Sequence, residues 1–210
     1  MYRFRNENIT NANQSTVTYA SGFVPDLNVP ALGADYFCGN LHKWFLSPRG
    51  AAFLYVRPGE DPEPLVVSHG YGEGFNSNFI WHGAADYSAA LALPQLAEWW
   101  RNVGLERAIS HNANLRREAV DMLAGRWHTE PLTDYGGAMA LVRVPFPEGV
   151  VMTSADGKAL QDRLHFDYAI ECPVKTVNGK LYVRISAAVY NEHDDYHRLA
   201  QAVEEIALIK

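Results

Sequence analysis

The chain has 210 residues, of which 48% are hydrophobic and 20% are charged, a globular composition that excludes a disordered protein. Its 18 Lys and Arg residues against 24 Asp and Glu residues give a formal net charge of -6, which leaves no overall attraction for nucleic acid. The two cysteines, Cys38 and Cys172, have no Cys-x-x-Cys spacing, so we expect neither a disulfide framework nor a cysteine zinc site. This cysteine usage fits a reducing, cytoplasmic location.

Residues 1–14 are polar, and no later stretch is both long and apolar enough to span a bilayer. We therefore expect neither a secretory leader nor a membrane anchor. Membranes and nucleic acids are not expected partners.

The first predicted strand covers residues 51–56, a short apolar and aromatic run that ends before a Pro-Gly pair. The segment 61–78 is rich in Pro and Gly, and we expect it to form neither helix nor strand. Apolar residues then recur at spacings of three and four from about 86 to 101. This periodicity predicts an amphipathic helix with a kink at Pro94.

A second helix is predicted from about residue 105 to 123, with Gly125 as its stop. The C-terminal part then changes pattern. It is predicted to form a strand over 138–144, a helix over 156–165, a strand over 181–185 and a helix over 194–209. This alternation indicates a small α/β unit from about residue 126 onward.

Lys43 lies in the sharpest local feature of the sequence, the run from Gly39 to Gly50 before the first predicted strand. Its sequence neighbours are aromatic and apolar, so we expect an apolar setting. Such a setting disfavours the ammonium form of a lysine, as a Schiff-base amine requires. The alternative is a lysine at a turn whose charged end reaches water.

The stretch from Gly33 to Tyr55, with the run Asn40 to Trp44 at its centre, resembles the lysine segment of class V aminotransferases. Within that family it is most similar to the isopenicillin N epimerase-like and cysteine desulfhydrase-like branch. The resemblance implies that Lys43 holds pyridoxal 5'-phosphate as a Schiff base. It also implies a homodimer that acts on a small amino acid by transamination, epimerisation or carbon–sulfur elimination.

The fold class implied is α/β, the C-terminal part of a pyridoxal-phosphate transferase of fold type I. Residues 1–19 would be an atypical N-terminal segment. Residues 20–125 would be the remainder of the large domain, including the end of its sheet, and residues 126–210 the small C-terminal α/β domain.

Two further stretches support the resemblance. The segment Trp81 to Asp86 is similar to the family's Trp-x-Gly-Thr-x-Asp segment, which approaches the cofactor phosphate of the neighbouring subunit, so Gly83 would bind cofactor. Arg184 begins an Arg-Ile-Ser run similar to the family's late Arg-x-Ser strand. In relatives that arginine grips the substrate α-carboxylate, a task suited to a planar bidentate donor. An exposed strand arginine in a surface pair is the alternative for Arg184.

Asn40 and His42 lie on the turn that carries Lys43 and are candidates for the phosphate side of the cofactor. Asn40 replaces a serine that relatives use for this contact. For His42, a packed or solvent-bonded histidine is the alternative interpretation.

Three departures from the family pattern argue against independent catalytic activity of this chain. Relatives have an Asp that pairs with the pyridine nitrogen, but the corresponding place near Thr16 or Val17 has no acidic residue. Ala84 stands where relatives use a phosphate-binding Thr. Relatives also carry a whole N-terminal half, so we expect a truncated or alternatively initiated form with unpaired strand edges and a bare apolar face. The alternative function is a non-catalytic remnant that binds a full-length paralogue or a second copy of itself.

The remaining candidates carry less weight. His193 and His197 have the spacing of two metal ligands on one helix face, as in a hydrolase or metal protein, but a solvated helix start is the preferred interpretation and no metal site is expected. Cys172 would be either a persulfide-carrying nucleophile or, preferably, a structural thiol. Trp99 and Trp100 are expected in core or dimer packing.

Overall fold

The computed structural model describes residues 2–4, 16–19, 27–81, 83–132, 137–146 and 149–208. They form two compact units, one up to residue 102 and one from residue 103 onward. The expected domain division after residue 125 stays a prediction, and the long helix that contains this position lies wholly in the second unit. Within the described part of the chain, none of the helices combines the length and apolar character that crossing a bilayer requires.

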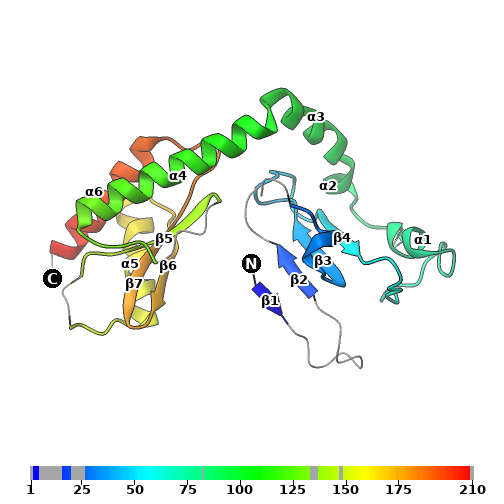
Figure 1. Cartoon of the computed structure of the whole chain (residues 1–210), viewed down its shortest axis with the longest axis horizontal. Helices are drawn as coiled ribbons and strands as arrows, with labels where there is room; N and C mark the ends of the chain where they lie inside the picture. Colours follow the sequence, from blue (N-terminus) through cyan, green and yellow to red (C-terminus); the bar gives the residue numbers. More distant parts are fainter. Residues whose placement is uncertain are drawn as a thin grey trace. The chain divides into compact units, whose positions relative to one another are not determined.

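The first unit contains a four-stranded sheet in the order β1-β2-β3-β4 (Figure 1). Its strands are β1 (Tyr2–Phe4), β2 (Thr16–Tyr19), β3 (Tyr36–Asn40) and β4 (Ala52–Val56). The central pair, β2 and β3, is parallel, whereas β1 and β4 each run antiparallel to their neighbour. The strand predicted over 51–56 is confirmed as β4. The expectation of unpaired edges is wrong at β2, because β1 pairs with its outer side.

One face of this sheet has a small core. Phe37 on β3 is fully buried and lies against Phe53 on β4, with ring centroids 5.6 Å apart. Leu27, Val29 and Leu32, at and before the short 3-10 helix η1 (Pro30–Leu32), pack against it. On the opposite face Leu54 is 43% exposed, since register places it opposite Cys38 and away from Phe37.

The helices of the first unit differ from the predicted ones. The single kinked helix expected over 86–101 is two helices, α2 (Ser88–Leu91) and α3 (Leu93–Val103). Pro94 is the reason, because it has no N–H for an intrahelical bond and is tolerated only in a first turn, where α3 places it. The expectation of no helix within 61–78 is also wrong, since α1 (Phe75–Ile80) begins there.

The second unit packs three helices on a three-stranded antiparallel sheet of order β5-β7-β6 (Figure 1). Its elements are α4 (Leu105–Trp127), β5 (Met139–Arg143), α5 (Ser154–Tyr168), β6 (Val174–Val177), β7 (Lys180–Ser186) and α6 (His193–Leu208). The helices and strands predicted in this region are confirmed, with ends that move by at most four residues, the largest change being at the end of α4. Strand β6 was not predicted.

Strand β6 is joined to β7 by the two-residue turn Asn178-Gly179. Both residues have positive φ, +49° and +71°, as tight hairpin turns require. The Asn-Gly pair is the sequence signal for this hairpin, but the short Val-Lys-Thr-Val run before it carries too little apolar pattern to mark a strand by itself.

Helix α4 continues through Gly125, so the predicted stop at this residue is wrong. The helix ends at Trp127, and His128 adopts the left-handed conformation with φ of +54°. The amide of Thr129 then donates to the carbonyl of Ala124 across 3.0 Å. This arrangement satisfies the last carbonyls of the helix without a glycine.

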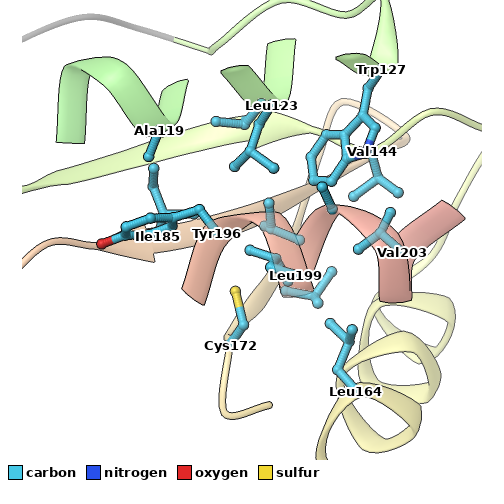
Figure 2. Packing of buried hydrophobic residues seen from close by; sticks show 14 of the residues in the cluster. Ala119, Leu123, Trp127, Val144, Leu164, Cys172, Ile185, Tyr196, Leu199 and Val203 are labelled. Atoms are coloured by element: carbon cyan, nitrogen blue, oxygen red, sulfur yellow. The ribbon is translucent and has the colours of Figure 1, made fainter. Parts of the chain in front are cut away.

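The core of the second unit lies between the sheet and helices α4, α5 and α6. Figure 2 shows Leu123 and Trp127 of α4 together with Leu199 and Val203 of α6, and all four are buried. On β7, Leu181, Val183 and Ile185 point into this core and are at most 2% exposed. The alternation of the strand therefore directs Arg184 to the opposite face.

Candidate functional site

Lys43 lies on the turn that joins β3 to β4, three residues beyond the end of β3. The amide of Leu41 donates to the carbonyl of Ala51 across 3.1 Å, and the amide of Ser47 donates to the carbonyl of Leu41 across 3.1 Å. This end of β3 is also the carboxyl end of the parallel pair β2 and β3. Ligands of α/β sheets bind beyond the carboxyl ends of parallel strands, so the turn stands where a cofactor site belongs.

The apolar setting expected for Lys43 is not formed by the described residues. Lys43 is exposed. Its neighbour Phe45 turns toward α3, where its ring stacks on Trp100 with centroids 6.4 Å apart. Phe45 is thus close to Lys43 in sequence, but the turn directs its ring toward α3 and not into the apolar setting expected around the lysine.

His42 and Asn40 share the turn with Lys43. His42 is half-buried, and its Nδ1 atom is buried without a hydrogen-bond partner within the described residues. A buried imidazole nitrogen left in this state costs free energy, which an added ligand atom would recover. Asn40 is exposed at the last position of β3. The structure thus brings three of the predicted site residues together on one short segment.

Gly83 lies on another loop of the same unit, between α1 and α2. Its φ of +89° is a conformation that a side chain rarely adopts, and a Cβ built there would have open space around it. The Tyr87 hydroxyl donates to the Gly83 carbonyl across 2.7 Å, while the Tyr87 ring stacks on Trp81 at 5.2 Å. Tyr87 therefore fixes this loop, a role that the sequence reasoning missed although the residue directly follows the segment Trp81 to Asp86.

Asp86 closes the same loop through hydrogen bonds to Ser88, the first residue of α2. Its Oδ1 accepts hydrogen bonds from the amide of Ser88 at 2.9 Å and from the Ser88 hydroxyl at 2.5 Å. These hydrogen bonds to Ser88 hold the pKa of Asp86 below its ordinary value. Ala84, where relatives have a Thr, is exposed.

Arg184 lies in the second unit, at the middle of β7 and opposite Leu141 of β5. Its amide donates to the carbonyl of Pro173 across 2.8 Å, and its side chain is exposed on the sheet face away from the helices. The structure therefore fixes its backbone and leaves the guanidinium available. Arg184 and Lys43 belong to different units.

Cys172 is buried in the core of the second unit. It is 5% exposed, and its Sγ atom lies 3.6 Å from the carbonyl oxygen of Arg184. Burial raises the pKa of the Cys172 thiol to about 12, which keeps the thiol protonated. These observations support Cys172 as a structural thiol, and they do not support it as a nucleophile that carries a persulfide.

His193 is engaged with an acidic residue of α4. Its Nε2 lies 2.5 Å from Glu118 Oε2, so the imidazole links the start of α6 to α4. No group of three His, Cys, Asp or Glu side chains within the described residues could hold a metal ion. His193 and His197 are both exposed in the first turns of α6.

Comparison with known proteins gives a consistent set of relatives, although no family model matches the chain. It is 34% identical to putative L-cysteine desulfhydrase 1 of Oryza sativa subsp. japonica over 90% of its own length and 44% of the relative's. It is 32% identical to an L-cysteine desulfhydrase of Arabidopsis thaliana, covering 86% of this chain and 44% of that one. Isopenicillin N epimerase of Amycolatopsis lactamdurans is 29% identical over 90% of this chain and 50% of its own.

Solved structures show the same fold. The apo cysteine desulfurase of Thermococcus onnurineus NA1 matches with a TM-score of 0.66 at 18% identity, over 93% of this chain and 52% of that one. The cysteine desulfurase CsdA of Escherichia coli matches with a TM-score of 0.60 at 20% identity, over 86% and 48%. The chain thus spans about half the length of the proteins it matches.

Proposed function

Because this chain belongs to the class V aminotransferase family, as a portion of a pyridoxal-phosphate enzyme of fold type I, we propose that it supplies the cofactor lysine of such an enzyme. The observation that carries the proposal is the position of Lys43. It lies on an exposed turn at the carboxyl end of a parallel strand pair, within the stretch that resembles the family's lysine segment.

The residues around Lys43 fit pyridoxal phosphate. The buried Nδ1 of His42 has no described partner, and a phosphate oxygen would satisfy it. Asn40 offers an amide at the end of β3, and the loop of Gly83 leaves open space where a side chain would otherwise stand. Lys43 would hold the cofactor through the imine that an amine forms with an aldehyde, with His42, Asn40 and Gly83 on the phosphate side.

The chain's own residues would divide the work on a small amino acid. Lys43 Nζ moves a proton at the substrate Cα, and the guanidinium of Arg184 holds the α-carboxylate through two parallel hydrogen bonds. The bound cofactor, when present, withdraws electron density from the bonds at that carbon. Transamination, epimerisation and carbon–sulfur elimination all begin with this proton transfer. L-cysteine is the first substrate to test, because L-cysteine desulfhydrases are among the relatives above 30% identity.

Cofactor addition tests the proposal. The purified chain is titrated with pyridoxal phosphate while the absorbance band of the imine is recorded, and Lys43→Ala is compared with Lys158→Ala. Lys158 is an exposed lysine on α5 that pairs with Asp162, so it serves as the matched control. We expect the band in the wild type and in Lys158→Ala but not in Lys43→Ala. An equal band in Lys43→Ala, or none in the wild type at saturating cofactor, refutes the proposal.

The second candidate function is a non-catalytic remnant that serves as a binding or dimerisation partner. One observation favours it: β2 carries no acidic residue, although relatives place the Asp that pairs with the ring nitrogen in this region. A Lys43-dependent band without sulfide release from L-cysteine supports this candidate.

Assembly and location complete the proposal. A homodimer, or pairing with a full-length paralogue, would supply the rest of a shared site, and sedimentation velocity of the cofactor-loaded chain tests it, since a monomer contradicts it. A cytoplasmic location is the proposal that follows from the cysteine usage, while one desulfhydrase relative is chloroplastic.

A further inference from the structure

Trp100 is attached directly to the turn that carries Lys43. Its indole Nε1 donates a hydrogen bond to the carbonyl oxygen of Phe45 across 2.8 Å, and its ring stacks on the Phe45 ring at an interplanar angle of 28°. Trp100 is 3% exposed. One buried side chain on α3 therefore holds both the backbone and the side chain of a residue two positions after Lys43.

The bonded carbonyl belongs to the peptide group that precedes a residue with a strained backbone. The next residue, Leu46, has a φ of +63°, a left-handed conformation that leucine rarely adopts. A carbonyl that is free to rotate would let the turn relax away from this conformation. By fixing the orientation of the peptide group between Phe45 and Leu46, the indole keeps the turn in its observed form.

Ala89 of α2 lies close to the far end of the same segment. A Cβ built on Gly50 would lie 3.9 Å from the Cβ of Ala89, which is buried on α2. The turn is thus backed near its far end by α2 and near Lys43 by α3. Of these two supports, only the one from Trp100 includes a directional hydrogen bond.

We propose that Trp100 is a positioning residue for Lys43, acting through the Phe45 carbonyl. The inference rests on the proposed function, since it assigns to Trp100 the placement of the amine that holds the cofactor. Reaction of an amine with a bound aldehyde depends steeply on geometry, and a displacement of about 1 Å costs on the order of a hundredfold in rate. The link joins residues 55 positions apart, so no local sequence pattern marks it.

The test compares two indole-to-phenyl substitutions. Trp100→Phe removes the N–H and keeps an aromatic ring, whereas Trp99→Phe changes the adjacent indole, which is 42% exposed and meets Trp100 edge-on at 4.8 Å. Each full-length variant is mixed with pyridoxal phosphate, and the Lys43-dependent absorbance band is followed per folded molecule, with folding measured by circular dichroism. We expect imine formation at Lys43 to be at least about tenfold slower in Trp100→Phe and unchanged in Trp99→Phe.

Hydrogen exchange provides the readout that does not need the cofactor. In Trp100→Phe we expect the amides of Leu41 and Ser47 to lose protection while those of β3 and β4 keep it. Loss spread evenly over the whole sheet, or a band that forms at the wild-type rate, overturns the inference. If the wild type itself forms no band, the proposed function fails, and the exchange of Leu41 and Ser47 still decides whether Trp100 positions the turn.

Discussion

The Tyr196 hydroxyl donates a hydrogen bond to the carbonyl of Ser186 across 2.8 Å, joining the first turn of α6 to the last residue of β7. Tyr196 is 5% exposed, and burial raises the pKa of its hydroxyl. The group therefore stays a donor at neutral and moderately alkaline pH. Because Ser186 follows Arg184 by two residues, this bond also steadies the strand that presents the arginine.

Tyr196→Phe should lower the free energy of unfolding by about 1 to 2 kcal/mol, because the Ser186 carbonyl loses this donor in a partly buried position. Urea unfolding followed by circular dichroism measures the change. Tyr190→Phe is the control, since Tyr190 is 69% exposed and should change stability by less than about 0.5 kcal/mol. Equal losses in the two variants would contradict the role given to the hydroxyl.

Gly125→Ala should stabilise the protein by about 0.5 to 1 kcal/mol, because Gly125 lies inside α4 and a Cβ there would meet nothing within 4 Å. Thermal unfolding measures the gain. A glycine that stopped the helix in a left-handed conformation would give the opposite sign, so a clear loss of stability would disprove the observed end of α4 at Trp127.

Gly179→Ala should destabilise the β6–β7 hairpin by about 1 to 2 kcal/mol. Gly179 has φ of +71°, and a Cβ there would lie 3.1 Å from Cγ1 of Val151. Urea unfolding beside Gly125→Ala gives an internal comparison, as the two glycine-to-alanine changes are expected to have opposite signs. A neutral result would mean that the turn relaxes without cost.

Cys172 should resist alkylation in the folded protein. With a pKa of about 12, roughly one thiol in ten thousand is ionised at about pH 8, and burial blocks access as well. Iodoacetamide labelling read by mass spectrometry should therefore modify Cys172 only after denaturant is added. Labelling at the same rate with and without denaturant would show that the thiol is accessible.

The same thiol links stability to pH. Its pKa is raised on folding from an ordinary value near 9.0, so the protonated form is favoured in the folded state. The contribution of the protonated Cys172 thiol to the free energy of unfolding is therefore fully present below about pH 9, and it is lost as the pH rises toward about 12. Cys172→Ala should flatten this alkaline decline in urea unfolding measured between these pH values.

Much of the second unit could be predicted from sequence because its periodicity is strong. Leu115, Ala119 and Leu123 recur along α4 and are buried, as are the alternating apolar residues Leu181, Val183 and Ile185 of β7. The end of α4 was missed because His128, and not a glycine, takes the left-handed position. The hydrogen bonds from the amides of His128 and Thr129 to the last turn determine where the helix ends, and the amino-acid composition of this segment does not reveal them.

The first unit was less predictable. The strand pairing of β2 with β3 joins residues twenty positions apart, and β2 is too short and polar to show a pattern. The motif identified Lys43 correctly as a turn residue before a strand, but the direction of Phe45 depends on Trp100, 55 residues away. Tertiary contacts of this kind decide which way a side chain faces, and a local pattern does not contain them.

Strand β1 pairs with β2 through only three residues, Tyr2 to Phe4, and runs antiparallel beside the parallel pair. Such a short ladder has few backbone hydrogen bonds to lose, so a longer strand approaching β2 would exchange with it at low cost. We therefore expect β1 to shield this side of β2 only weakly, so that a longer competing strand would replace it and extend the sheet.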